Sequence, residues 1–125
     1  MARTKTFTGK AFPIDELGCE PLHSIVGPEL CAQFMQMFDV RLSNGHVVRA
    51  FKHKTTRCYL HLDRPEAGLA YWYTDTGRYR LVDLTGALIA VFRDLWRLEH
   101  DDDVTQTWQL LNQALDRLET SPPPG

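Results

Sequence analysis

Residues 38–84 read FDVRLSNGHVVRAFKHKTTRCYLHLDRPEAGLAYWYTDTGRYRLVDL. Short runs of β-branched and aromatic residues alternate here with turn-forming residues, which is typical of antiparallel strands joined by tight turns. Asn44-Gly45 favours a two-residue type I′ turn, because both residues tolerate a positive φ. With these two residues as the loop, Leu42 pairs with Val47 and Phe38 pairs with Phe51. The stretch therefore predicts a β-meander that opens with this hairpin.

The predicted register separates an apolar face of the hairpin from a polar one, as in an antiparallel sheet with one covered face. Arg49 is the only charged residue on the apolar face. The other members of that face are Phe38, Val40, Leu42, Val47 and Phe51.

Three further runs continue the meander, at residues 56–62, 69–74 and 78–84. In the first of them apolar and polar residues alternate, which indicates a half-buried strand. The length of the loop around Gly77 decides whether Tyr71 or Trp72 points into the core. Both alternatives remain open from the sequence.

Two amphipathic helices are predicted after the sheet. Apolar residues recur at helical spacing over Thr85–Glu99, although residues 87–92 taken alone also suit a strand. Asp103 and Gln106 form a variant of the capping box, which predicts the start of the last helix. Upstream, Pro28 favours the first turn of a short helix that carries Leu30, Phe34 and Phe38 on one side. Residues 1–20 have no clear period and are expected to be irregular or edge structure.

These patterns predict an α+β fold: an antiparallel β-meander of about five strands, preceded by a short helix and followed by two amphipathic helices packed on one face. With 125 residues, of which 43% are hydrophobic, the chain suits a single domain over 1–125 with one core. The ends, residues 1–8 and 120–125, are expected to be flexible.

The three cysteines, Cys19, Cys31 and Cys58, are an odd number at spacings that suggest no disulfide framework. No apolar run reaches the ~20 residues of a membrane span, and the N-terminus has no secretory h-region. We therefore expect reduced cysteines, a cytoplasmic location and no membrane partner.

The sequence carries no strong signature of a metal site, a cofactor or catalysis. Cys58 and His61 have a C-x-x-H spacing, but residues three apart on a strand face opposite sides. The acidic run at residues 99–103 lacks the pattern of a calcium loop. No nucleophile elbow or phosphate-binding loop is present. We expect no metal and no cofactor, and a non-enzymatic function more than an enzymatic one.

Basic residues gather in the early sheet, where residues 40–64 carry six Lys and Arg against one acid. Residues of this type suit phosphate contacts and stacking on single-stranded bases. The residues that would bind nucleic acid are Arg41, Lys52, Lys54, Arg57 and Tyr59. The competing interpretation is a solvated strand face, and the overall net charge of −2 opposes binding to a polyanion.

Trp96 and Leu110 widen the apolar stripes of the two helices beyond what one sheet face must cover, and Trp72 belongs to an aromatic cluster. Such residues favour protein interfaces, although cores use them as often. The preferred hypothesis is thus a small cytosolic protein-interaction module that binds another protein or a homodimer mate through Trp96, Leu110 and Trp72. The alternatives are single-stranded nucleic-acid binding through residues 40–64, and a small-molecule or catalytic pocket between sheet and helices.

Overall fold

The computed structural model describes residues 5–13, 19–64, 68–93, 95 and 101–120. These residues form one antiparallel sheet of seven strands together with four helices. The strands are β1 (Thr6–Phe7), β2 (Gly9–Phe12), β3 (Phe34–Leu42), β4 (Val47–His53), β5 (Tyr59–Asp63), β6 (Ala70–Tyr73) and β7 (Tyr79–Val82). The helices are α1 (Leu22–Val26), α2 (Pro28–Cys31), α3 (Leu84–Phe92) and α5 (Asp101–Thr120).

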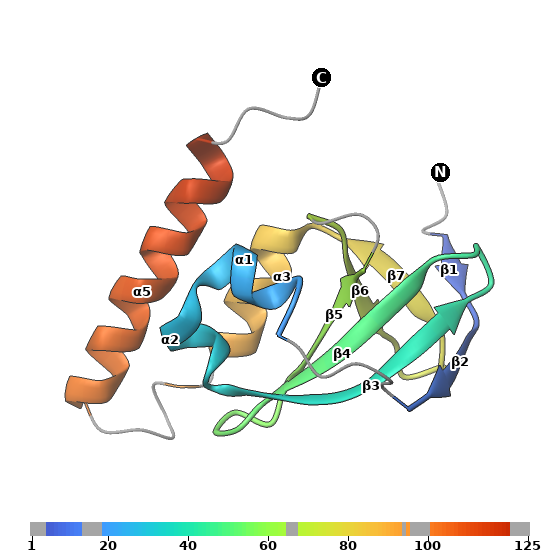
Figure 1. The fold of residues 1–125 in the computed structure, drawn as a ribbon, viewed down its shortest axis with the longest axis horizontal. Helices are drawn as coiled ribbons and strands as arrows, with labels where there is room; N and C mark the ends of the chain where they lie inside the picture. The colour runs from blue at the N-terminus through green and yellow to red at the C-terminus, as the bar shows by residue number, and fades with distance from the viewer. Residues whose placement is uncertain (1–4, 14–18, 65–67, 94, 96–100, 121–125) are drawn as a thin grey trace.

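The N-terminal segment closes this sheet into a near-barrel. The strand order is β1-β7-β6-β5-β4-β3-β2, and only Thr8 separates β1 from β2 in the sequence. The same segment therefore pairs with β7 through β1 and with β3 through β2, which Figure 1 shows at the side away from the helices. At the junction, the amide of Ser43 donates to the carbonyl of Thr8 at 2.8 Å. Closure covers both edges of the meander.

Gly9 lies at this closure, where the barrel wall is tightest. A Cβ atom on Gly9 would lie 2.6 Å from Val40 Cγ1 and 2.7 Å from Tyr79 Cε1. Both neighbours are buried, so neither can move aside into solvent. A residue without a side chain is required here because the N-terminal segment approaches the inner wall closely.

We expect Gly9→Ala to destabilise the fold by about 1–3 kcal/mol, which is the usual range for overpacking. The melting temperature followed by circular dichroism measures this effect. Gly86→Ala is the matched control, because a Cβ there meets only Asp83 Oδ2 at an ordinary 3.6 Å and lies in the first turn of α3. Equal melting temperatures for the two variants would contradict the tight closure.

Two apolar clusters lie on the two sides of the sheet. The inner cluster, inside the barrel, consists of Val40, Leu42, Val48, Tyr71 and Tyr79, with Phe7 and Phe38 packed against it. The outer cluster packs the other face of the sheet against the helices; Phe51, Leu60 and Leu62 are its contribution from β4 and β5. Because both faces are buried, residues 60–63 of β5 are all buried in succession.

The helices form a layer on one side of the barrel (Figure 1). Helix α3 packs on β5 and β6, and α5 packs on α1 and α2. Asp83 caps α3 by accepting a hydrogen bond from the amide of Gly86 at 2.9 Å. Residues 87–92 are helical, so the strand alternative for them is wrong. No helix within the described ranges has both the length and the apolar character that crossing a bilayer demands.

The predicted fold is wrong in its number of strands and in its layout, although the α+β class holds. The sheet has two more strands, which come from the N-terminal segment that was expected to be irregular or edge structure, with residues 1–8 flexible. The short helix is also shorter than predicted: α2 ends at Cys31, and Phe34 and Phe38 belong to β3. The chain therefore builds a nearly closed barrel rather than a sheet with a single covered face.

The predicted hairpin register is wrong by one residue. The amide of Leu42 donates to the carbonyl of His46, and Val40 pairs with Val48. The loop thus has three residues, with Gly45 at a φ of +91°, as in loops that combine a turn with a left-handed glycine. A shift of one residue moves every side chain of a strand to the other face. Phe51 therefore packs against the helices, and Val48 replaces Val47 in the barrel.

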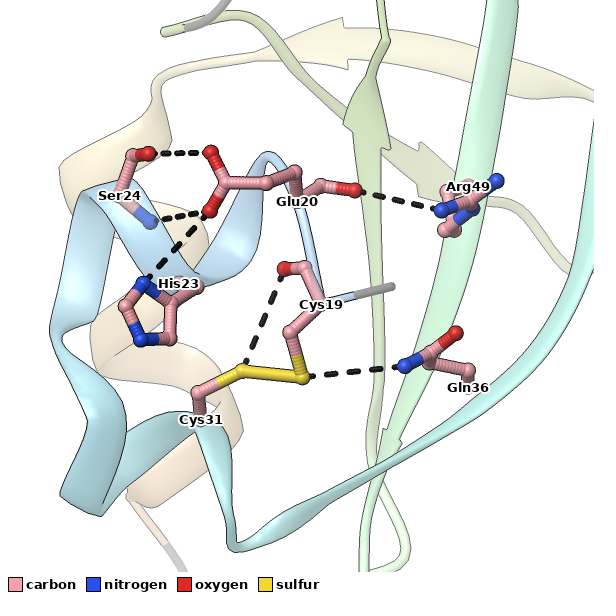
Figure 2. Close-up of polar contacts among 7 residues, drawn as sticks. All are labelled: Cys19, Glu20, His23, Ser24, Cys31, Gln36 and Arg49. Atoms are coloured by element: carbon pink, nitrogen blue, oxygen red, sulfur yellow. Dashed lines mark hydrogen bonds and ion pairs between the residues drawn. A yellow bond between two sulfur atoms is a disulfide. The ribbon is translucent and has the colours of Figure 1, made fainter. Parts of the chain in front are cut away.

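The prediction of reduced cysteines is also wrong, because Cys19 and Cys31 form a disulfide. Figure 2 shows how the bond ties the segment before α1 to the end of α2. In the same segment, the Glu20 carboxylate accepts hydrogen bonds from the amide and the hydroxyl of Ser24 in α1. The Glu20 carbonyl accepts a hydrogen bond from Arg49 on β4 at 3.5 Å, so this segment is fixed onto the sheet.

Candidate functional site

A cavity of about 620 Å³ lies at one mouth of the barrel. It opens at the end that carries the turn between β6 and β7, since Gly77 of that turn is part of its wall. Aromatic rings supply most of the wall, and none of its described residues is Asp, Glu, Lys or Arg. The lining residues are Gly9, Ala11, Phe38, Cys58, Tyr59, His61, Trp72, Tyr73, Gly77 and Tyr79.

The aromatic rings of the wall are in contact with one another around His61. The ring of Tyr59 stacks on the imidazole with 5.9 Å between centroids and an interplanar angle of 15°. Tyr79 meets the imidazole edge-on at 5.2 Å and also packs against Tyr73 at 4.9 Å. Contacts of this geometry are favourable beyond the area they bury, so the wall holds its shape without a ligand.

Strand pairing explains why these side chains converge. Tyr59 and His61 are two residues apart on β5 and share its inner face. Tyr73 and Tyr79 are directly paired across the β6–β7 hairpin, and the amide of Thr74 closes the turn by donating to the carbonyl of Arg78. Alternation on three adjacent strands thus directs four rings to the same end of the barrel.

The same pairing decides between Tyr71 and Trp72. Tyr71 is 2% exposed, belongs to the inner cluster and meets the ring of Phe7 edge-on at 6.3 Å. Trp72 is half-buried and contributes to the cavity wall from the neighbouring position on β6. The core position therefore belongs to Tyr71.

His61 is the one histidine among the described residues of the cavity wall, and it is 4% exposed. Burial lowers the pKa of His61 to about 4, because the protonated form would lose its hydration. Its contacts with the described residues are ring contacts, and no described residue forms a hydrogen bond with either ring nitrogen. At neutral pH the imidazole is therefore uncharged and has one donor and one acceptor unused.

The hydroxyl of Tyr79 adds no charge to the cavity. Burial, together with neighbouring Tyr73, raises the pKa of Tyr79 above its ordinary value of 10.0. Lys52 is the direct partner of Tyr59 across β4 and β5, and its ammonium lies 5.3 Å from the centre of the Tyr59 ring, a cation–π contact. The site is thus an aromatic cavity with a single neutral imidazole.

Two buried polar clusters lie away from the cavity. At the opposite end of the barrel, Asp63 accepts hydrogen bonds from Tyr71 and pairs with His46. On the outer face, Asp39 binds both Arg49 and Arg64 at 2.8 Å. None of these six residues lines the barrel cavity or the cavities beside the helices. Their geometry therefore supports a structural role.

The residues predicted to bind a protein do not come together in the described structure. Trp72 lines the barrel cavity, whereas Leu110 on α5 lines two cavities beside α2. Leu110 also packs partly against the outer cluster. Trp96 lies outside the described residues.

The residues predicted to bind nucleic acid are spread over the sheet. Arg41 lies on β3, where it pairs with Val47 of β4. Lys52 of β4 pairs with Met35, which precedes Arg41 by six residues on β3. At ~3.3 Å per residue this separates them by about 20 Å along the strand. Val47 and Lys52 also have opposite parity on β4, so Arg41 and Lys52 lie on opposite faces.

The other three residues of that set have separate local roles. Lys54 donates from Nζ to the carbonyl of Ala32 at 3.0 Å, which connects the β4–β5 turn to the end of α2. Arg57 has a positive φ of 64° in the same turn. Tyr59 faces the barrel cavity rather than solvent.

Within the ranges that the structure describes, no group of three or more His, Cys, Asp or Glu side chains could hold a metal ion. Cys58 and His61 both border the cavity, although Cys58 also packs against the outer cluster. Cys58 is a free thiol, and its Sγ lies 3.8 Å from the carbonyl of Thr56.

Sequence reasoning missed the aromatic site as a unit. The sequence patterns assign Trp72 to an aromatic cluster and raise His61 only as a metal ligand, so they do not connect the two residues. The available signal was the alternation of rings at Tyr59 and His61, continued on the next two strands. Comparison with known proteins found no family, no curated protein and no solved structure that matches this chain.

Proposed function

We propose that this protein is a small-ligand-binding β-barrel that holds its ligand in the aromatic cavity at the barrel mouth. Ligand sites are typically concave, mostly apolar and equipped with a few polar groups, and they occur at the mouths of barrels. The observation that carries the proposal is the buried His61, which lines the cavity and leaves its nitrogens unpaired among the described residues. A buried polar group of this kind gains from a partner that a ligand can supply.

Binding suits the site better than catalysis does. A general base works best when its pKa lies near the working pH, and burial lowers the pKa of His61 to about 4. No carboxylate or cationic side chain belongs to the cavity wall, so the residues described there offer no charge for a developing transition state. The rigid stack of rings is instead suited to hold a flat surface.

A blocking substitution in the cavity tests the proposal. Ala11 is exposed on β2 and lines the cavity, so Ala11→Trp fills ligand space without disturbing the core. Titration with the neutral fluorescent probe N-phenyl-1-naphthylamine should show saturable binding to the native protein. The affinity of Ala11→Trp should be lower by about tenfold or more, because its indole occupies the site.

Ala32→Trp is the matched control, since Ala32 is also exposed but lines a different cavity, beside α2 and α5. It should bind the probe as the native protein does. A second variant, Tyr73→Ala, removes a ring that is 53% exposed and should weaken binding without unfolding. Absence of saturable binding, or equal binding by the Ala11 and Ala32 variants, would sink the proposal.

The other functions expected from the sequence stay predictions. A protein or homodimer interface would involve Leu110 on α5, and nucleic-acid binding would have to use basic residues on both faces of the sheet. The cytoplasmic location is likewise a prediction, and the Cys19–Cys31 disulfide favours an oxidising compartment over it.

A further inference from the structure

We infer that the ligand of the barrel cavity is an uncharged, flat aromatic molecule with one polar group that hydrogen-bonds to His61. This inference rests on the proposed function and specifies its ligand class. Three properties of the cavity carry it: the shape of its wall, the absence of charge and the unpaired imidazole.

The wall favours a flat ring system. Phe38, Tyr59, Tyr73 and Tyr79 contribute rings that are already packed against one another or against His61. A planar aromatic ligand can stack on such rings or meet them edge-on, as aromatic pairs prefer. Gly9 and Gly77 add no side-chain bulk to the wall. The volume of about 620 Å³ lies within the range of cavities that hold drug-sized molecules.

The wall disfavours a charged ligand. A carboxylate or an ammonium that leaves water requires a counter-charge or several hydrogen bonds, and without them its burial is costly. The described residues that line the cavity include no charged side chain. The Lys52 ammonium is not part of this lining and lies over the ring of its strand partner Tyr59. An ionised ligand would therefore lose hydration without compensation.

The polar group of the ligand follows from His61. A neutral imidazole has one N–H donor and one lone-pair acceptor, and the described residues meet His61 through ring contacts only. A hydroxyl on the ligand can donate to the lone pair, and a carbonyl can accept from the N–H. A bond made inside this buried site adds to the affinity, whereas a ligand with no polar group leaves the imidazole unpaired.

Three ligands of the same ring size separate these requirements: naphthalene, 2-naphthol and 2-naphthoate. Each is titrated at neutral pH for its ability to displace N-phenyl-1-naphthylamine from the native protein. We expect 2-naphthol to bind about fivefold more tightly than naphthalene, as one added hydrogen bond provides. We expect 2-naphthoate to bind at least about tenfold more weakly than 2-naphthol, because its charge is not compensated.

His61→Phe removes the hydrogen-bonding nitrogens and keeps a ring in place. In this variant the preference for 2-naphthol over naphthalene should disappear, while naphthalene itself still binds. Equal or tighter binding of 2-naphthoate by the native protein would overturn the inference, as would a preference for 2-naphthol that survives in the variant.

The two proposals fail in different ways. If the probe binds to the native protein but the three ligands displace it equally, the ligand class is wrong and the binding cavity stands. If the probe itself does not bind, the proposed function is wrong. The ligand series in the native protein decides the charge requirement even if His61→Phe does not fold.

Discussion

Replacing Asp39 by alanine is expected to lower the free energy of unfolding by about 3–5 kcal/mol, which is the typical loss when one partner of a buried ion pair is removed. Asp39 has no exposed surface, and its two carboxylate oxygens bind two arginines. Arg49 Nε lies 2.8 Å from Oδ1, and Arg64 Nη1 lies 2.8 Å from Oδ2. The variant would leave the guanidinium of Arg49 buried without its carboxylate.

The two arginines contribute unequally to this loss. Arg49 is 3% exposed and also holds the Glu20 carbonyl, so it cannot turn to solvent without releasing the segment before α1. The Arg64 side chain is 34% exposed and can regain hydration when Asp39 is absent. Most of the expected destabilisation therefore arises from Arg49, whose charge would have lost its counter-charge inside the protein.

Chemical denaturation measures the effect, with Asp75→Ala as the matched control. Asp75 is exposed in the β6–β7 turn, and removing its charge should change stability by less than about 0.5 kcal/mol. The double variant Asp39→Leu/Arg49→Met removes both buried charges and should be more stable than Asp39→Ala. An Asp39→Ala variant within about 1 kcal/mol of the native protein would show that the pair is not buried as the structure has it.

The regular elements could be predicted from the sequence, because their local patterns agree with their tertiary positions. The strands of residues 59–82 and the helix over Leu84–Phe92 follow hydrophobic periods that local chemistry determines. The closing segment is different. In Gly9–Phe12 three of four residues are exposed, so the segment has no apolar alternation. It becomes a strand because it pairs with the otherwise open edge of the sheet at β3, as β1 does at β7.

The stretch Phe34–Phe38 shows how one irregularity can mimic another structure. Phe34 and Phe38 have the spacing of one helix face, which predicted a longer helix after Pro28. In β3 the pairing register shifts between Gln36 and Phe38, and a bulge of this kind adds one residue. As a result Phe34 packs against the helices and Phe38 against the barrel interior. Local spacing cannot reveal a bulge, because the partner strand defines it.

The candidate site required both the closure and the correct register. The alternation of Tyr59 and His61 was visible, but an inner face exists for them only once the sheet closes. With a sheet covered on one side, those two residues were expected to face solvent. Closure turns that solvent face into a cavity wall, to which both Tyr59 and His61 contribute. The proposed binding cavity therefore depends on the closure of the sheet and not on a local sequence motif.

Acidification should destabilise the protein through His61, by about 3 kcal/mol between pH 7 and pH 4. Burial lowers the pKa of His61 to about 4 in the folded protein. In the unfolded chain, where the imidazole is exposed to water, the pKa has its ordinary value of 6.5. Between these values the unfolded chain binds a proton that the folded protein does not. Stability from this residue is therefore complete above pH 6.5 and falls as the pH is lowered toward 4.

The comparison with His61→Phe isolates this contribution. Denaturation curves of both proteins at several pH values from 7 to 4 contain the same effects of the other acids and histidines, so the difference between them reports on His61 alone. The rings that face His61 belong to Tyr59, Tyr73 and Tyr79, and no carboxylate is among the described residues that line the cavity. The native protein should thus lose more stability than the variant as the pH falls. Parallel losses in the two proteins would mean that the imidazole reaches solvent, and the cavity would then be an open surface rather than a site that depends on a neutral histidine.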